Sequence, residues 1–118
     1  MMALIYGDQA RWDSLSADER EQVYERYRAF ANEAREAGVM LGGEELASPS
    51  DATTVRLRGD ETLVTDGPYA EVKEALGGFF VFEVDDMGLA AEYAARIPGA
   101  EHGAVEIRPI YVDEEEES

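Results

Sequence analysis

The chain has 118 residues, the size of one ordinary domain, and its 45% content of hydrophobic residues provides enough apolar material for one core. Its 27 acidic residues against 10 basic ones give a formal net charge of −17, a surface that repels phosphate backbones and anionic membranes and so argues against direct nucleic-acid or membrane binding. The absence of cysteine excludes disulfides and thiolate metal sites and is typical of a cytoplasmic protein.

The first part of the chain is predicted to form a strand, a loop and a long helix. Residues 2–6 are short and apolar, as in a strand, and residues 7–14 are expected to form the loop. Ser16 and Glu19 form a capping-box pattern, which opens a helix over residues 16–37. Apolar side chains recur in this helix every three to four residues, and this spacing predicts one buried stripe.

Glycines, prolines and acidic caps divide the rest of the chain into short elements. Gly38 is expected to end the long helix, and Gly42–Gly43 to interrupt the strand that follows it. Asp85 and Asp86 supply cap oxygens for a second helix. The other expected elements are a hairpin (53–58 and 61–65), a helical turn (72–76), a central strand (78–84), a last strand (104–110) and a disordered acidic tail (113–118).

Strands and helices that mix without strict alternation predict the α+β class. The central strand places Phe80, Phe82 and Val84 on one side and Phe79 and Val81 on the other, so both faces of the sheet are expected to be buried. Two helices cover only one face of such a sheet. The apolar residues of the second face therefore predict a homodimer, in which a partner chain covers that face of the sheet.

A motif in the middle of the chain carries a family resemblance. Residues 65–74 read Thr-Asp-Gly-Pro-Tyr-Ala-Glu-Val-Lys-Glu and lead into Leu-Gly-Gly-Phe-Phe at residues 76–80. Further matching pieces are Leu-Gly-Gly-Glu (41–44), Thr-Thr-Val-Arg (53–56), Pro-Gly-Ala (98–100) and Val-Glu-Ile-Arg-Pro (105–109). In this order they resemble the DGPF family of the YCII-related group, with Tyr69 in place of the family's phenylalanine.

The resemblance implies a single YCII-related (DGPF) domain over residues 1–112, built as a ferredoxin-like sandwich that pairs into a dimeric α/β barrel. Enzyme-like members of the group use a histidine on the first helix and an aspartate after the second helix. In this chain residues 16–37 contain no histidine, and residues 97–101 contain no aspartate. The resemblance therefore does not imply acid–base catalysis by such a dyad in this chain.

Five residues are predicted to converge on one ligand-binding cleft between the sheet and the helices. They are Tyr6, Asp66, Tyr69, Lys73 and Arg108. Tyr6 and Arg108, on the first and last strands, can hold a carboxylate or carbonyl of a small ligand. Arg108 has Glu106 or an acidic neighbour across the dimer as an alternative partner.

Several of these residues also have a structural interpretation. Asp66 either begins a turn that needs a positive φ at Gly67 or is an acid beside the cleft. Lys73, the only lysine, either pairs with Asp66 or binds an anionic group. His102, the only histidine, is either a solvated loop residue or a general base.

Two functions of different classes follow from the sequence. The first is a homodimer that binds a small polar or aromatic ligand in the sheet–helix cleft, with or without catalysis. No cofactor and no metal site are expected, because a single histidine cannot build a metal site alone. The second, implied by the resemblance, is an accessory or regulatory protein associated with an extracytoplasmic-function sigma factor. The acidic surface suits a basic partner of that kind.

Overall fold

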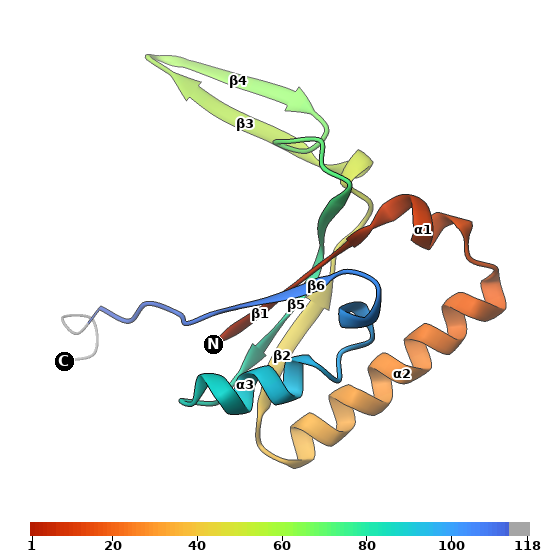
Figure 1. Ribbon diagram of the computed structural model, residues 1–118. Helices are drawn as coiled ribbons and strands as arrows, with labels where there is room; N and C mark the ends of the chain where they lie inside the picture. Colours follow the sequence, from red (N-terminus) through yellow and green to blue (C-terminus); the bar gives the residue numbers. More distant parts are fainter. Residues whose placement is uncertain (114–118) are drawn as a thin grey trace.

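The computed structural model describes residues 1–113 (Figure 1). The main elements of this part of the chain are β1 (Met2–Asp8), α1 (Gln9–Ser14), α2 (Ala17–Glu36), β2 (Met40–Glu45), β3 (Thr53–Arg58), β4 (Glu61–Asp66), β5 (Glu74–Phe82), α3 (Met87–Ala94) and β6 (Ala104–Arg108). Short 3₁₀ helices span Pro49–Asp51 and Pro98–Glu101. The predicted α+β class is confirmed. Of the predicted tail, residues 114–118 lie outside the described residues.

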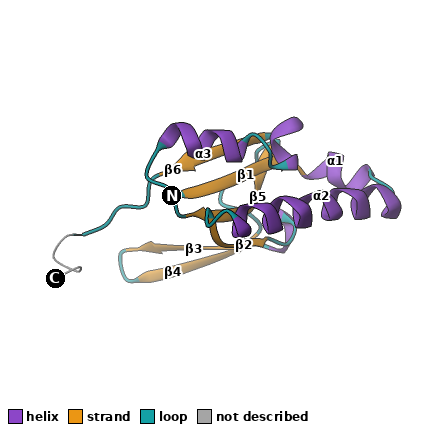
Figure 2. Ribbon diagram, turned by 90° about the horizontal axis from the view of Figure 1, so that it is seen from below, coloured by secondary structure: helices purple, strands orange, loops and turns teal. Residues whose placement is uncertain are grey.

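Four antiparallel strands form the main sheet, in the order β2-β5-β1-β6. The first strand of the chain is thus central, between the two strands that come last. Strands β3 and β4 pair only with each other, as a separate hairpin. Figures 1 and 2 both show this hairpin projecting away from the main sheet. None of the helices in residues 1–113 has the length and apolarity needed to cross a membrane.

The core lies between one face of the main sheet and the helices α2 and α3. Phe30 and Ala34 come from α2, Ala90 and Ala94 from α3, and all four pack in one buried cluster with Phe82 of β5. The predicted two-sided strand is confirmed, because Phe80 and Phe82 pack in this core while the alternating Phe79 and Val81 belong to the opposite face. We call that opposite side of the sheet the open face, since no helix of the described chain covers it.

The predicted caps at Ser16, Gly38 and Asp86 are present, whereas the N-cap of α3 is Asp86 and not Asp85. The Ser16 hydroxyl accepts a hydrogen bond from the Glu19 backbone N–H at 3.1 Å, and the Glu19 carboxylate accepts one from the Ser16 N–H at 2.9 Å, which completes the capping box. These two bonds lower the pKa of Glu19. Gly38 ends α2 with a φ of 74°, and the Asp86 carboxylate caps α3.

Several predicted elements differ from the structure, among them the central strand, which was expected over residues 78–84 and spans Glu74–Phe82. Residues 9–14 form the helix α1 rather than a loop, with Asp8 as its cap. Strand β2 continues through Gly42–Gly43 instead of breaking there. The helical turn predicted for residues 72–76 is absent, because β5 begins at Glu74 and pairs with β1. The last strand ends at Arg108, two residues earlier than expected.

The Asp66-Gly67-Pro68 segment is a turn, and its glycine has a φ of 100°. An alanine Cβ at Gly67 would meet no atom within 4 Å, so the cost of Gly67→Ala is the backbone conformation alone. We expect this substitution to lower the free energy of unfolding by about 1–2 kcal/mol, measured by urea denaturation. Gly88→Ala, at an ordinary φ inside α3, is the control and should leave stability equal or higher. Equal losses in both variants would contradict the turn argument.

Candidate functional site

A cleft of about 950 Å³ opens between the N-terminal half of α2 and the main sheet. It exists because the buried residues of α2, Phe30 and Ala34, lie in its C-terminal half, whereas Val23 and Tyr27 nearer its start are only partly buried. Helix α1 closes one end of the cleft, and the 3₁₀ helix Pro98–Glu101 closes another.

Aromatic side chains from different elements form one wall of this cleft. The Trp12 ring of α1 meets the Tyr24 ring edge-on, with centroids 5.4 Å apart, and the Arg20 guanidinium lies 5.7 Å from the Trp12 centroid. Arg20 also donates to the backbone oxygen of Trp12 at 3.2 Å, which holds α1 against α2. The only tryptophan of the chain is therefore fixed at the mouth of the cleft.

Two tyrosine hydroxyls connect α2 to the other side of the cleft. Tyr24 donates to Glu45 Oε1 at 3.0 Å, and burial, followed by this hydrogen bond, raises the pKa of Tyr24. The Tyr27 hydroxyl accepts from the Gly99 backbone N–H at 3.1 Å, and burial raises its pKa as well. Both phenols are therefore neutral near pH 7. A Cβ on Gly99 would come within 2.8 Å of the Tyr27 oxygen, so only glycine permits this approach.

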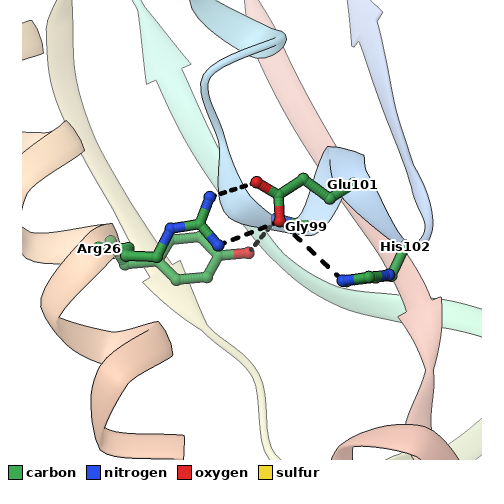
Figure 3. Close-up of polar contacts among 5 residues, drawn as sticks. Arg26, Gly99, Glu101 and His102 are labelled. Carbon is green, nitrogen blue, oxygen red and sulfur yellow. Dashed lines mark hydrogen bonds and ion pairs between the residues drawn. The ribbon is translucent and has the colours of Figure 1, made fainter. Parts of the chain in front are cut away.

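An ion pair lies beside these tyrosines, where Arg26 of α2 faces Glu101 (Figure 3). Two hydrogen bonds join the side chains, Nη1 to Oε2 at 3.0 Å and Nη2 to Oε1. The hydrogen bond from Arg26 lowers the pKa of Glu101, which stays ionised. His102 Nε2 lies 4.0 Å from Glu101 Oε2, on the other side of the carboxylate. All three side chains are about half exposed, so a ligand can reach them.

The elements expected to carry a histidine and an aspartate in enzyme-like relatives do come together here. The long helix and the segment after α3 meet, but the pair that joins them is Arg26 and Glu101. An arginine cannot act as a general base at neutral pH, and the carboxylate opposite it is engaged. This arrangement suits the binding of a polar or anionic group better than proton transfer. Within residues 1–113, no group of three acidic or histidine side chains is arranged to hold a metal ion.

Tyr6 and Arg108, two of the five predicted site residues, meet at Glu106. The Tyr6 hydroxyl donates to Glu106 Oε1 at 3.3 Å, and Arg108 Nη2 donates to Oε2 at 3.4 Å. The alternative partner foreseen for Arg108 is thus confirmed. Tyr6 is the member of the predicted set that borders the cleft.

The other three predicted residues lie on the hairpin or after it. Asp66 ends β4, and Tyr69 packs its ring 4.8 Å from the Arg56 guanidinium. Lys73 is exposed just before β5 and forms no ion pair with Asp66 among the described residues. Within the single chain, Tyr6 and Arg108 therefore lie close together. That all five predicted residues line one cleft stays a prediction.

Sequence reasoning missed most of the residues that line the cleft. The sequence pattern predicts a loop for residues 7–14, which include Trp12. The partners of the hydrogen-bonded pairs are far apart in the chain, 21 residues for Tyr24 and Glu45 and 75 residues for Arg26 and Glu101. No local spacing rule connects residues so distant.

Comparison with known proteins gives two matches. A family model of the YCII-related domain matches residues 1–113. The chain is also similar to an uncharacterized protein of Rhizobium meliloti (strain 1021), with 32% identity over 109 residues. That alignment covers 91% of this chain and 88% of the other protein.

Proposed function

This chain belongs to the YCII-related family, and from that premise we propose that it forms a homodimer that binds a small polar or aromatic ligand in the sheet–helix cleft. The observation that carries the proposal is the lining of the cleft. Aromatic rings from α1, α2 and β5 lie in the same cavity as the Arg26–Glu101 ion pair. Apolar walls with a few polar groups that fix orientation are the usual composition of a small-molecule site.

The open face supports the dimer. Its apolar side chains include Met2, Leu4, Leu41, Phe79 and Val81, and the strand register places the charged Glu44, Glu106 and Arg108 of the outer strands β2 and β6 on the same face. Leu41 is 64% exposed in the single chain. A second sheet packed face to face would remove these side chains from water. The strand order β2-β5-β1-β6 is that of a ferredoxin-like sandwich, so two such sheets together would form the dimeric α/β barrel implied by the family resemblance.

The cleft defines the chemistry of the ligand. A flat ring would pack between the Trp12 and Tyr24 rings on one side and Phe80 on the other. A carboxylate on that ring would compete with Glu101 for the Arg26 guanidinium, which binds carboxylates through two parallel hydrogen bonds. Because this ion pair is about half exposed, exchanging one carboxylate for another costs little.

Trp12 provides the test, because the emission of the single tryptophan reports the cleft alone. Three probes separate the ligand's parts: benzoate has a ring and a carboxylate, phenol has only the ring, and cyclohexanecarboxylate has only the charge. We expect benzoate to change Trp12 emission saturably. Arg26→Gln should weaken benzoate binding at least about tenfold and leave phenol binding unchanged.

Arg96→Gln is the matched control, since Arg96 also forms an exposed ion pair, with Glu33 at 2.7 Å, but does not line the cleft. It should titrate like the parent protein with all three probes. Equal weakening by Arg26→Gln and Arg96→Gln would contradict the proposed role of Arg26. No saturable change with any probe would reject the ligand site and favour the regulatory alternative.

A further inference from the structure

The β3–β4 hairpin has one apolar face that no described residue of its own chain covers. Strand register places Val55 opposite Val64 and Leu57 opposite Thr62, so these side chains share one face. Val55, Leu57 and Val64 are 62%, 71% and 64% exposed. We call this surface the apolar arm face.

The opposite face of the hairpin is charged and already has a contact of its own. There Arg56 lies opposite Leu63, and Arg58 lies opposite Glu61. The Arg56 guanidinium packs on the Tyr69 ring. Apolar residues on one side and charged residues on the other are the pattern of a hairpin with one buried face. An isolated two-stranded hairpin is only marginally stable in water, so burial of the apolar arm face against another surface would stabilise it.

The base of the hairpin is fixed by hydrogen bonds around Gly67. The Gly67 N–H donates to Ala52 O at 2.7 Å, and the Thr54 hydroxyl donates to Gly67 O at 2.8 Å. These bonds hold the two ends of the hairpin together. Figure 1 shows that it projects to the side of the main sheet opposite α2 and α3, which is the side of the open face.

We propose that a second copy of this chain covers the apolar arm face, so that each protomer's hairpin lies against its partner. This inference rests on the homodimer proposed above and adds a second contact to it. Because the hairpin projects on the side of the open face, a second copy seated on that face would also lie beside the hairpin (Figure 1). A stable dimer buries about 800 Å² per partner, more than three arm side chains supply, and the open face provides the remainder.

The charges of the chain also favour a second copy as the partner of the apolar arm face. The side chains of Val55, Leu57, Thr62 and Val64 carry no charge, and the charged residue that shares their face by register is Asp66, at the base of the hairpin. A basic partner would be drawn to the acidic remainder of a chain with net charge −17 rather than to these four side chains. Two copies of so acidic a protein repel each other unless the surfaces that meet are apolar. Both the arm face and the centre of the open face meet that condition.

Sedimentation velocity of the full chain tests the proposal with paired substitutions. Val64→Asp puts a charge on the apolar arm face, and Leu63→Asp puts the same charge on the neighbouring residue of the charged face. We expect the parent protein to sediment as a dimer at micromolar concentration. Val64→Asp should raise the dimer dissociation constant at least about 100-fold, since each dimer would bury two such charges, and Leu63→Asp should change it less than about threefold.

A milder variant guards against local unfolding of the hairpin. Val64→Thr keeps the β-branched shape and strand preference but replaces a methyl group by a hydroxyl, so it should weaken the dimer in the same direction by about tenfold. Thermal unfolding of each variant checks that the body remains folded. If the parent protein, Val64→Asp and Leu63→Asp all dimerise equally well, the arm contact is wrong, while a dimer through the open face remains possible. A monomeric parent would overturn both, whereas the Trp12 titration would still test the cleft.

Discussion

Replacing Phe82 with alanine is expected to lower the free energy of unfolding by about 3–5 kcal/mol, the largest effect among the substitutions considered. Phe82 is 1% exposed and lies where the two helices meet the sheet. Its ring is 6.4 Å from those of Phe30 and Tyr93 and 6.5 Å from that of Phe80. Removing it leaves a cavity that its neighbours in β5, α2 and α3 cannot all collapse to fill.

Urea denaturation measures this loss, with Phe82→Leu and Tyr111→Ala as comparisons. Phe82→Leu keeps most of the apolar volume and should cost clearly less. Tyr111→Ala also removes an aromatic ring, but Tyr111 is 88% exposed, so the change should stay within about 0.5 kcal/mol. A cost for Phe82→Ala no greater than that for Tyr111→Ala would show that Phe82 is not part of the core.

Gly103→Ala is the second substitution with a large expected effect, about 3 kcal/mol. A Cβ at this position would lie 2.0 Å from the backbone oxygen of Tyr6 and 3.2 Å from the Cα of Gly7. Both are backbone atoms of β1, so no side-chain rotation relieves the overlap. The chain must move away from β1 just where β6 begins to pair with it, at Ala104 opposite Tyr6.

Gly7→Ala is the matched control, because a Cβ on Gly7 meets nothing within 4 Å. It should be neutral or slightly stabilising, since it restricts the unfolded chain. The same experiment reports on the cleft, which Gly103 borders. Any Gly103→Ala protein that folds should show altered Trp12 emission with benzoate. A Gly103→Ala protein as stable as Gly7→Ala would contradict the close approach of residue 103 to β1.

The elements predicted correctly are those whose signals are local. The capping box at Ser16 and Glu19 defined the start of α2, and the alternation of residues 53–58 defined the hairpin. The errors arose where contacts distant in sequence decide the outcome. Residues 71–76 read Glu-Val-Lys-Glu-Ala-Leu, which are mostly good helix formers, yet Glu74 pairs with Asp8 across the sheet.

The glycine pair in β2 shows a different kind of error. The sequence predicts a break at Gly42–Gly43, because glycine is common where a strand is interrupted. In the structure a Cβ on Gly43 would lie 2.4 Å from the Phe79 carbonyl oxygen, so glycine is required for close packing within a continuous strand. Sequence alone does not separate these two uses of glycine.

The candidate site was less predictable than the fold. Two of its predicted members, Asp66 and Tyr69, lie in or just after the hairpin, which projects away from the main sheet in a direction that no periodicity of the sequence predicts (Figure 1). The cleft itself depends on the tilt of α2 away from the sheet. Buried positions confined to one end of a helix are not visible in a regular apolar stripe such as that of Val23, Tyr27, Phe30 and Ala34.

The central position of β1 has a consequence for biosynthesis. Its hydrogen-bonding neighbours are β5 and β6, which span residues 74–82 and 104–108. At 5–20 residues per second, roughly 5–20 s pass between the synthesis of β1 and that of β6. Until β5 is made, the apolar first strand has none of its sheet partners, and only α1, α2 and the hairpin have all their local contacts. The nascent chain therefore completes this sheet only after β6 has been made, although its central strand is made first.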